Sequence, residues 1–228
     1  MTDSQARAAA APFTVLHICL GNICRSPMAE RLLATRFAQR VTERDPGASA
    51  GVLLVSHSAG TGDWHVGQSM QSGSTRQLAR LGIASDGFRA RTLDLPLLER
   101  TDLVLTATGQ QAHGVGYLDP SLRGRVFPLL PFARYAGEVA ARVIADATDL
   151  EITAAGVRAR GEALIHAVAE RAAQEAPDYA EDVVDPYGSS DGVFAAVADT
   201  IDRAVAPLAA VLAGVNVRVP DKAVSSDR

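Results

Sequence analysis

The sequence is poor in cysteine, in long apolar runs and in positive charge, and each shortage argues against a class of protein. Two cysteines in 228 residues cannot form a disulfide framework, and no second cysteine pair completes a zinc site. No apolar run approaches the roughly 20 residues that span a bilayer. The formal net charge of −4 argues against a general nucleic-acid binder, because such proteins usually carry a basic face. A protein with no membrane span, in a compartment that keeps thiols reduced, fits these shortages.

The rest of the composition is ordinary for a soluble globular domain. It is 47% hydrophobic and 21% charged, and the length suffices for one hydrophobic core. Without internal repeats or a convincing linker, we expect a single domain over residues 13–216, with loose tails at 1–12 and 217–228. The first tail lacks the apolar segment of a signal peptide, so we expect a cytoplasmic protein.

Four short apolar runs predict the strands of a parallel sheet. They are Phe13–Leu20, Val52–Ser58, Asp102–Thr106 and Arg125–Leu130. Pro128 lies in the fourth run, and because proline has no N–H for a sheet ladder, that strand is expected at an edge.

Helical patterns separate and follow these strands. After Pro27, an apolar residue recurs every four positions, with Ser26 as the expected N-cap and Pro27 as the first helical residue. The stripe consists of Ala29, Leu33, Phe37 and Val41. Further helices are expected over Met70–Leu81, over the alanine-rich stretch Ala136–Gln174 and after Ser190. Alternating strands and helices predict an α/β fold with a parallel sheet.

The segment Cys19–Ser26 lies between the first strand and the first helix. Backbone N–H groups converge at such a turn and the helix dipole favours an anion, so the site suits a phosphate dianion and a thiolate beneath it. Arg25 supplies a planar fork that matches two phosphate oxygens. Taken alone, however, a cysteine followed by arginine six positions later is a weak pattern, and a buried structural cysteine is the commoner explanation.

Three further residues of this segment are suited to such a loop. Gly21 allows a close approach of the backbone, and Asn22 tolerates a left-handed turn. Ser26 is placed to donate a hydrogen bond to the thiolate of Cys19.

Residues 17–30 (HICLGNICRSPMAE) resemble the signature of the low-molecular-weight protein-tyrosine phosphatases. Four other parts of the chain resemble this family in the same order. They are Ser58–Gly67, Leu81–Ile83 with Arg89–Arg91, Asp102–Leu105, and Asp185–Gly188 with Ser190 and Asp191. The resemblance implies the fold of phosphotyrosine protein phosphatase I, a four-stranded parallel sheet flanked by helices on both faces.

The resemblance also implies the roles of the catalytic residues. Cys19 is the expected nucleophile, which forms a cysteinyl-phosphate, Arg25 holds the phosphate, and Asp185 is the general acid. Asp-Pro by itself is a common turn starter, so the role of Asp185 depends on the resemblance. Neither a cofactor nor a metal ion is expected.

Substrate contacts are implied for the loop and for two aromatic residues. The expected substrate-binding residues are Leu20, Gly21, Asn22, Ile23, Cys24, Ser26, Trp64 and Tyr187, and Ser58 is expected to support the loop through Asn22. Trp64 and Tyr187 are candidates for a slot around an aryl phosphate, with ordinary packing as the alternative for Trp64. Cys24 is either simply packed or forms a reversible disulfide with Cys19. The five histidines show no metal-ligand spacing and are interpreted as structural or surface residues.

Three departures from the family pattern stand out. Ala107 and Thr108 replace a Met-Asp pair after the third strand, and Phe88 replaces a loop-supporting histidine. The segment before Asp185 is longer than in the family by an inserted helical part at about residues 136–178. This insertion has four possible roles: a lid, a substrate-selecting wall, a docking surface or a surface elaboration.

The predicted function is the hydrolysis of phosphotyrosine on a protein, or of a small aryl phosphate, with inorganic phosphate as product. Two alternatives stay open: an arsenate reductase, which generally needs further thiols, and a catalytically weak phosphate-binding module. No nucleic-acid partner is expected, and the protein is expected to be a monomer or a weak dimer.

Overall fold

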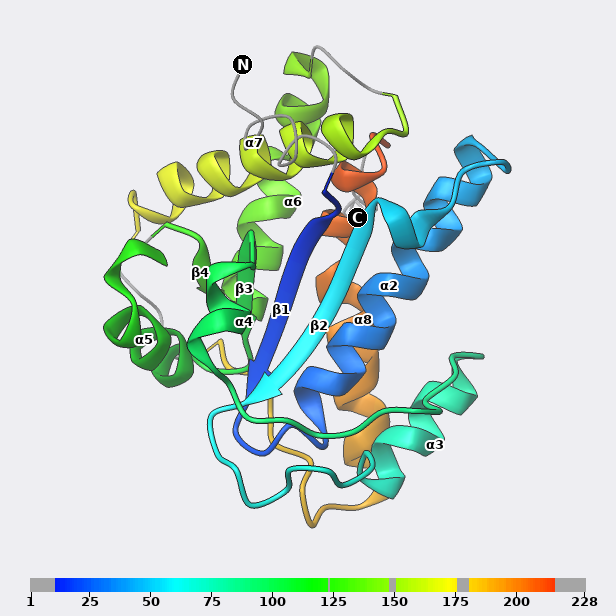
Figure 1. Cartoon of the computed structure of the whole chain (residues 1–228), viewed down its shortest axis with the longest axis vertical. Coiled ribbons are helices and arrows are strands. Elements are labelled where there is room, and N and C mark those ends of the chain that lie inside the picture. Colours follow the sequence, from blue (N-terminus) through cyan, green and yellow to red (C-terminus); the bar gives the residue numbers. More distant parts are fainter. Residues whose placement is uncertain (1–10, 123, 148–150, 176–180, 216–228) are drawn as a thin grey trace, which may run out of the picture.

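The computed structural model describes residues 11–122, 124–147, 151–175 and 181–215. Nearly all of the two predicted tails lies outside these residues. Four parallel strands form one sheet in the order β2-β1-β3-β4 (Figure 1). The strands are β1 (Phe13–Cys19), β2 (Leu54–Gly60), β3 (Leu103–Thr106) and β4 (Val126–Pro128). The predicted α/β fold is confirmed, and β4, with Pro128, is an edge strand.

Seven α-helices lie in the described part of the chain. They are α2 (Arg25–Arg44), α3 (Ser72–Arg80), α4 (Leu95–Glu99), α5 (Gly109–Leu118), α6 (Leu129–Asp146), α7 (Ala154–Ala172) and α8 (Asp191–Leu212), with short 3-10 turns at Ala50–Val52 and Pro120–Leu122. None of the helices in these residues is long and apolar enough to cross a membrane.

The helices cover both faces of the sheet because the side chains of β1 alternate between two buried layers. Phe13, Val15 and Cys19 face the layer that contains α2, α6 and α8. Leu16 and Ile18 face the smaller layer formed by α4 and α5. The predicted stripe of α2 is buried in the larger layer.

The first predicted helix start was wrong by two residues, with a physical reason. α2 begins at Arg25, and Cys24 occupies the N-cap position without a side-chain cap. Ser26 is not the cap because its hydroxyl group is bound to Cys19 and Asn22 instead. The predicted second strand also started too early: Val52 is exposed within a 3-10 turn, and β2 begins at Leu54.

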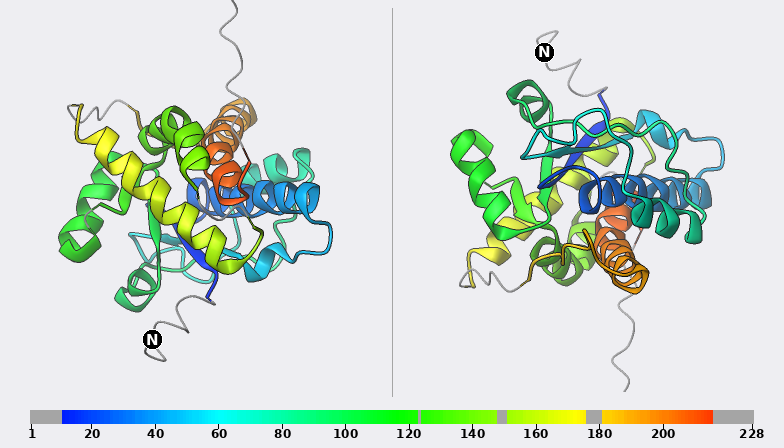
Figure 2. Two further views of the ribbon diagram at one scale, coloured as in Figure 1. Left: turned by 90° about the horizontal axis from the view of Figure 1, so that it is seen from above. Right: turned by 90° about the horizontal axis from the view of Figure 1, so that it is seen from below.

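The insertion predicted at about residues 136–178 consists of two helices, apart from its undescribed residues. α6 begins at Leu129, directly after β4, and ends at Asp146. The second helix, α7, is capped by Thr153, whose side chain accepts a hydrogen bond from the N–H of Gly156. α7 lies across the amino ends of the strands and appears in front of the other elements from above (Figure 2). Two contacts hold α7 there. Gly161 leaves room for the ring of Phe13, and Arg158 pairs with Asp102 at the start of β3.

Candidate active site

The predicted phosphate loop connects the carboxyl end of β1 with the amino end of α2, at the lower end of the sheet in Figure 1. The N-terminal N–H groups of α2 and its dipole therefore face this loop. Asn22 has a left-handed backbone with φ of 54°, as predicted. Gly21 is required by a close approach, because a Cβ atom there would lie 2.8 Å from the His65 ring.

A buried chain of hydrogen bonds fixes the loop from below. Asn22 Nδ2 donates to Ser26 Oγ and to Ser58 Oγ, each at 2.9 Å. Ser58 Oγ donates to Glu30 Oε2 at 2.6 Å, and Ser26 Oγ lies 3.0 Å from Cys19 Sγ. Because the Ser26 oxygen accepts from Asn22, its one hydrogen is available to Cys19 Sγ or to the carbonyl of Ala59 at 3.4 Å, and a Cys19 thiolate would be the stronger acceptor. The structure thus contains the predicted contacts of Ser58 with Asn22 and of Ser26 with Cys19.

Sequence reasoning missed two members of this network. Glu30 ends the chain of hydrogen bonds, and burial raises the pKa of its carboxyl group. The N–H of Arg91 donates to Asn22 Oδ1 at 2.9 Å, and its Nε donates to the carbonyl of Ser58 at 2.8 Å. Glu30 follows Ser26 by four positions on α2, which places both on one helix face, and this spacing was the available signal.

Backbone groups make the contacts found near the two short departures from the family pattern. Phe88 packs in the core, and the N–H of Arg91 satisfies the Asn22 side chain. Ala107 contributes its carbonyl group, which accepts from the N–H of Val183 at 2.9 Å, and any residue can supply that group.

Asp185 lies beside Arg25, although the two are 160 residues apart in the chain. Arg25 Nη2 is 2.7 Å from Asp185 Oδ2, and Arg25 Nη1 donates to the carbonyl of Val183 at 3.1 Å. The Arg25 side chain is 7% exposed and that of Asp185 is 45% exposed. The buried cation therefore anchors a carboxylate that faces solvent.

A cavity of about 330 Å³ opens above the loop. It is lined by Cys19, Leu20, Gly21, Ile23, Cys24, Arg25, Trp64, His65, Asp185 and Tyr187. The structure thus brings most of the predicted residues together around one opening, while Asn22, Ser26 and Ser58 lie beneath it.

Three rings form the rim of this cavity. Trp64 is 58% exposed and Tyr187 is 62% exposed, so the rim is open to solvent. The His65 ring lies between them, with ring centroids 6.1 Å from Trp64 and 6.2 Å from Tyr187. Gly62 determines the position of Trp64, whose ring occupies the space of a Cβ atom at Gly62. His65 is thus a site residue, whereas the sequence interpretation treated it as structural or superficial.

A sequence model of the family "low molecular weight phosphotyrosine protein phosphatase" matches residues 14–174. The chain belongs to this family. As a member, it falls in the class of protein-tyrosine phosphatases, hydrolases of phosphoric monoesters, as predicted.

Individual relatives agree with the family assignment. A low molecular weight protein-tyrosine phosphatase, PtpA, of Staphylococcus epidermidis is 31% identical over 120 residues, which are 52% of this chain and 70% of that protein. A low molecular weight protein tyrosine phosphatase of T. tengcongensis has a similar fold, with a TM-score of 0.57, 21% identity, and coverage of 86% of this chain and 97% of that chain. The arginine phosphatase YwlE of Geobacillus stearothermophilus has a TM-score of 0.55 at 21% identity and covers 87% and 91%.

The family match ends before the acid loop. Its last residue, 174, precedes Asp185 by more than ten positions. Asp185 is connected with the site by its ion pair with Arg25 and by its place in the cavity lining.

Cys24 is buried in this phosphatase and lines the cavity beside the nucleophile. Burial, followed by the neighbouring Cys19, raises the pKa of its thiol to about 12. Cys24 is therefore a neutral thiol at physiological pH and a poor nucleophile. Both cysteines are free in the structure, and the reversible disulfide stays a prediction.

His17 lies on β1 beneath the loop, near Arg25 and Ser26. Its ring is buried without a hydrogen-bond partner in the described residues, and burial lowers its pKa to about 3. Within the same residues, no group of three or more His, Cys, Asp or Glu side chains is arranged to hold a metal ion.

Proposed function

We propose that this phosphatase hydrolyses phosphotyrosine, or a comparable aryl phosphate, through a cysteinyl-phosphate on Cys19. Arg25 and the loop amides bind the phosphate dianion, and Asp185 is general acid and then general base. The observation that carries the proposal is the meeting of Cys19, Arg25 and Asp185 at one cavity, with Asp185 paired to the buried guanidinium.

In the first step, the Cys19 thiolate attacks phosphorus in line with the leaving oxygen. The S–P bond forms, the P–O bond to the phenol breaks, and the leaving oxygen takes the proton of Asp185. Arg25 and the amides of Leu20–Arg25 stabilise the charge on the three equatorial oxygens.

In the second step, the Asp185 carboxylate takes a proton from a water molecule. The water oxygen attacks phosphorus, the S–P bond breaks, and inorganic phosphate and the Cys19 thiolate are released. This cycle returns Asp185 to its protonated form, so protons balance over one turnover.

Substrate binding requires a change at Arg25. Its fork is bound to Asp185 and to the carbonyl of Val183, whereas a phosphate dianion needs the same N–H groups. Phosphate therefore displaces Asp185 from Arg25 and leaves the carboxyl group free to face the leaving oxygen.

The rim favours a flat aromatic substituent on the phosphate. Trp64, His65 and Tyr187 offer ring faces and edges above the nucleophile, and such contacts stabilise an aromatic ring more than an aliphatic one. We therefore place phosphotyrosine on a protein, or a small aryl phosphate, as the substrate class. Because two free thiols persist where they are kept reduced, we propose the cytoplasm as its location.

The alternative of arsenate reduction loses support from Cys24. That chemistry needs a second thiol to form a disulfide, and a thiol with a pKa of about 12 is a poor attacking group at neutral pH.

The direct test is the release of inorganic phosphate from a phosphotyrosine peptide and from a phosphoarginine peptide, between pH 5 and 8 without added metal. We expect turnover of phosphotyrosine in the native chain and none in Cys19→Ser, which should still bind phosphate. The proposal is contradicted by an inactive native chain that binds phosphate, or by a preference for phosphoarginine, the substrate type named for YwlE.

A further inference from the structure

The inserted helices contact the segment that leads into the acid loop. This segment, residues 181–183, is bound to the body of the fold by three contacts: Asp182 Oδ1 accepts from the N–H of Gly109 at 2.7 Å, the N–H of Val183 donates to Ala107, and the carbonyl of Val183 accepts from Arg25. The next residues, Val184 and Asp185, are largely exposed. The placement of Asp185 therefore depends on anchors just before it in the chain.

Arg134, in the part of α6 that precedes the predicted insertion, supplies a further anchor. Its Nε lies 3.1 Å from Glu181 Oε1, and its Nη1 lies 3.0 Å from Glu175 Oε2. One guanidinium thus binds residues on both sides of the connection from α7 to the acid loop. The same group stacks on Tyr135, with Cζ 4.3 Å from the ring centroid, so its direction is fixed by packing as well as by charge.

The partners of Arg134 are themselves held. Glu175 also accepts from the Tyr135 hydroxyl at 2.9 Å and pairs with Arg171, which in turn pairs with Glu138 at 2.6 Å. The bonds from Arg171 and then Arg134 lower the pKa of Glu175 to about 2. Glu175 is therefore charged throughout the pH range in which a phosphatase of this type would work.

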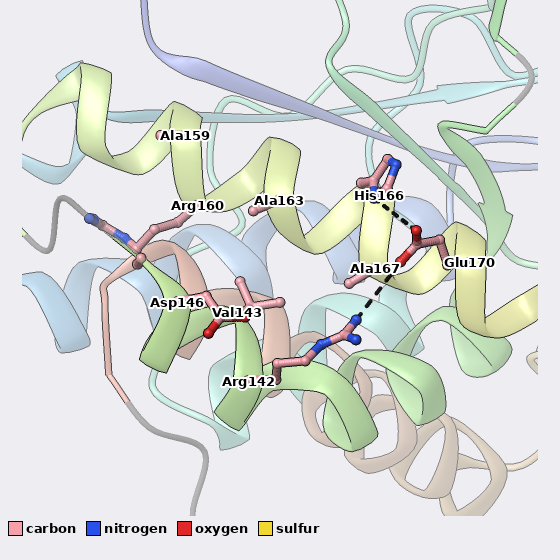
Figure 3. A pocket seen from close by; sticks show the side chains of 10 residues that line it. Arg142, Val143, Asp146, Ala159, Arg160, Ala163, His166, Ala167 and Glu170 are labelled. Carbon is pink, nitrogen blue, oxygen red and sulfur yellow. Dashed lines mark ion pairs between the residues drawn. The ribbon is translucent and has the colours of Figure 1, made fainter.

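A similar ion pair farther along α6 and α7 provides a comparison. Arg142 Nη2 on α6 lies 3.9 Å from Glu170 Oε2 on α7. The pair lies beside a groove of about 370 Å³ whose lining includes Ala163 and Ala167 (Figure 3). Glu170 also pairs with His166. Arg142 starts from the same helix as Arg134 but joins it to α7, and no described contact connects it with residues 181–185.

We propose that Arg134 is a positioning residue of the reaction, which holds Asp185 over the cavity through its ion pair with Glu181. This inference rests on the proposed function, since it needs Asp185 to be the general acid. It gives α6 a role in turnover: this helix braces the segment before the acid loop, in addition to covering the sheet.

The decisive experiment measures Arg134→Leu with two substrates that differ in their need for a general acid. Phenyl phosphate has a poor leaving group and p-nitrophenyl phosphate a good one. We expect kcat for phenyl phosphate to fall about fivefold and kcat for p-nitrophenyl phosphate to fall less. A fivefold loss matches the free energy that a partly exposed ion pair typically contributes. KM should stay within about twofold, because Arg134 does not touch the substrate.

Three variants make the test specific. Arg134→Lys keeps one charge pair and should recover part of the lost rate. Glu181→Gln removes the other partner and should repeat the loss. Arg142→Leu removes the comparison pair between α6 and α7 and should leave both rates unchanged.

A double variant separates positioning from general destabilisation. In an Asp185→Asn background, Arg134→Leu should cause no further loss, because the group that it positions is gone. An equal loss with both substrates, or the same factor in the Asp185→Asn background, contradicts the inference, and thermal melting of each variant shows whether unfolding is the reason.

The inference and the proposed function fail in different ways. If Asp185→Asn is slow with phenyl phosphate but Arg134→Leu is not, only the inference is wrong. If Asp185→Asn turns over like the native chain, the general-acid assignment is wrong, and the inference with it.

Discussion

The phosphate loop and the acid loop differ in how they are held. Asn22, Ser26 and Ser58 are buried and share their hydrogen bonds, so Cys19, the proposed nucleophile, lies in a frame that needs no substrate to form. Asp185 and Tyr187 are exposed, and the contact that aims Asp185 at the site is an ion pair that substrate must break. The comparison teaches that the proposed phosphate-binding half of the site is preorganised, whereas the carboxyl group of the proposed proton-transfer half is bound to a partner that it can exchange.

Arg25 belongs to both regions, so changing it should have a larger effect than changing the hydrogen bonds beneath the loop or the rim. Arg25→Lys keeps the charge but loses the planar fork, and we expect kcat/KM for p-nitrophenyl phosphate to fall about 10³-fold. Arg36→Lys is the matched control. Arg36 lies on α2 like Arg25, but it pairs with Asp202 of α8, away from the site. A loss below tenfold in Arg25→Lys means that a point charge suffices and that the fork is not used.

Substitutions in the two loops should also differ in how much they lower the free energy of unfolding. Asn22→Ala removes three side-chain hydrogen bonds and leaves alanine with a φ of 54°, which should cost about 3 kcal/mol of unfolding free energy. Asp185→Asn removes only a half-exposed ion pair and should cost less than about 1 kcal/mol. Urea denaturation measures both, and equal costs would contradict the distinction between a rigid and an exchangeable half.

The same difference explains what could be predicted. The phosphate loop is contiguous in sequence, so Cys19, Asn22 and Arg25 were identified from local chemistry and one family motif. Asp185 needed the resemblance, because no local pattern shows that residue 185 returns to residue 25. Four strands and the stripe of α2 followed from apolar periodicity.

Other features depended on tertiary contacts. Ser26 suited a helix cap by residue type, but a buried thiol and an amide use its hydroxyl group. His65 and Arg91 join the site only through the fold, and Glu30, although its spacing from Ser26 was a local signal, meets its partner Ser58 only there. The pairing of Arg134 with Glu175 and Glu181 across the insertion likewise has no local signature.

Acid should weaken the frame beneath the phosphate loop through His17. Its pKa is lowered from 6.5 to about 3 in the folded chain, so the unfolded chain takes up the proton first. This contribution to stability is fully present above about pH 6.5 and is lost as the pH falls toward 3, by roughly 2 to 3 kcal/mol between pH 7 and 4.5.

The difference between the native chain and His17→Leu isolates this effect. The raised pKa of Glu30 acts in the opposite direction, and it is common to both proteins. Urea denaturation at pH 7, 5.5 and 4.5 should show that His17→Leu loses less stability than the native chain. Parallel losses in the two proteins would show that His17 does not titrate in this window.

The rim should give the smallest effect, confined to binding. Trp64→Ala removes one wall of the aromatic slot, and we expect KM for phenyl phosphate to rise about fivefold with little change in kcat. An aliphatic phosphate monoester should show no such rise. Since the Trp64 side chain is largely exposed, unfolding should be unaffected, and a loss of stability would indicate a packing role instead.

The most direct test of the account is the dependence of Asp185→Asn on the leaving group. With phenyl phosphate, we predict a loss of about 10²- to 10⁴-fold in kcat, and a clearly smaller loss with p-nitrophenyl phosphate, whose phenolate leaves without a proton. That result establishes the residue anchored by Arg25 as the proton donor. An equal loss with both substrates would contradict the account, because Asp185 would then serve the structure of the site and not its proton transfer.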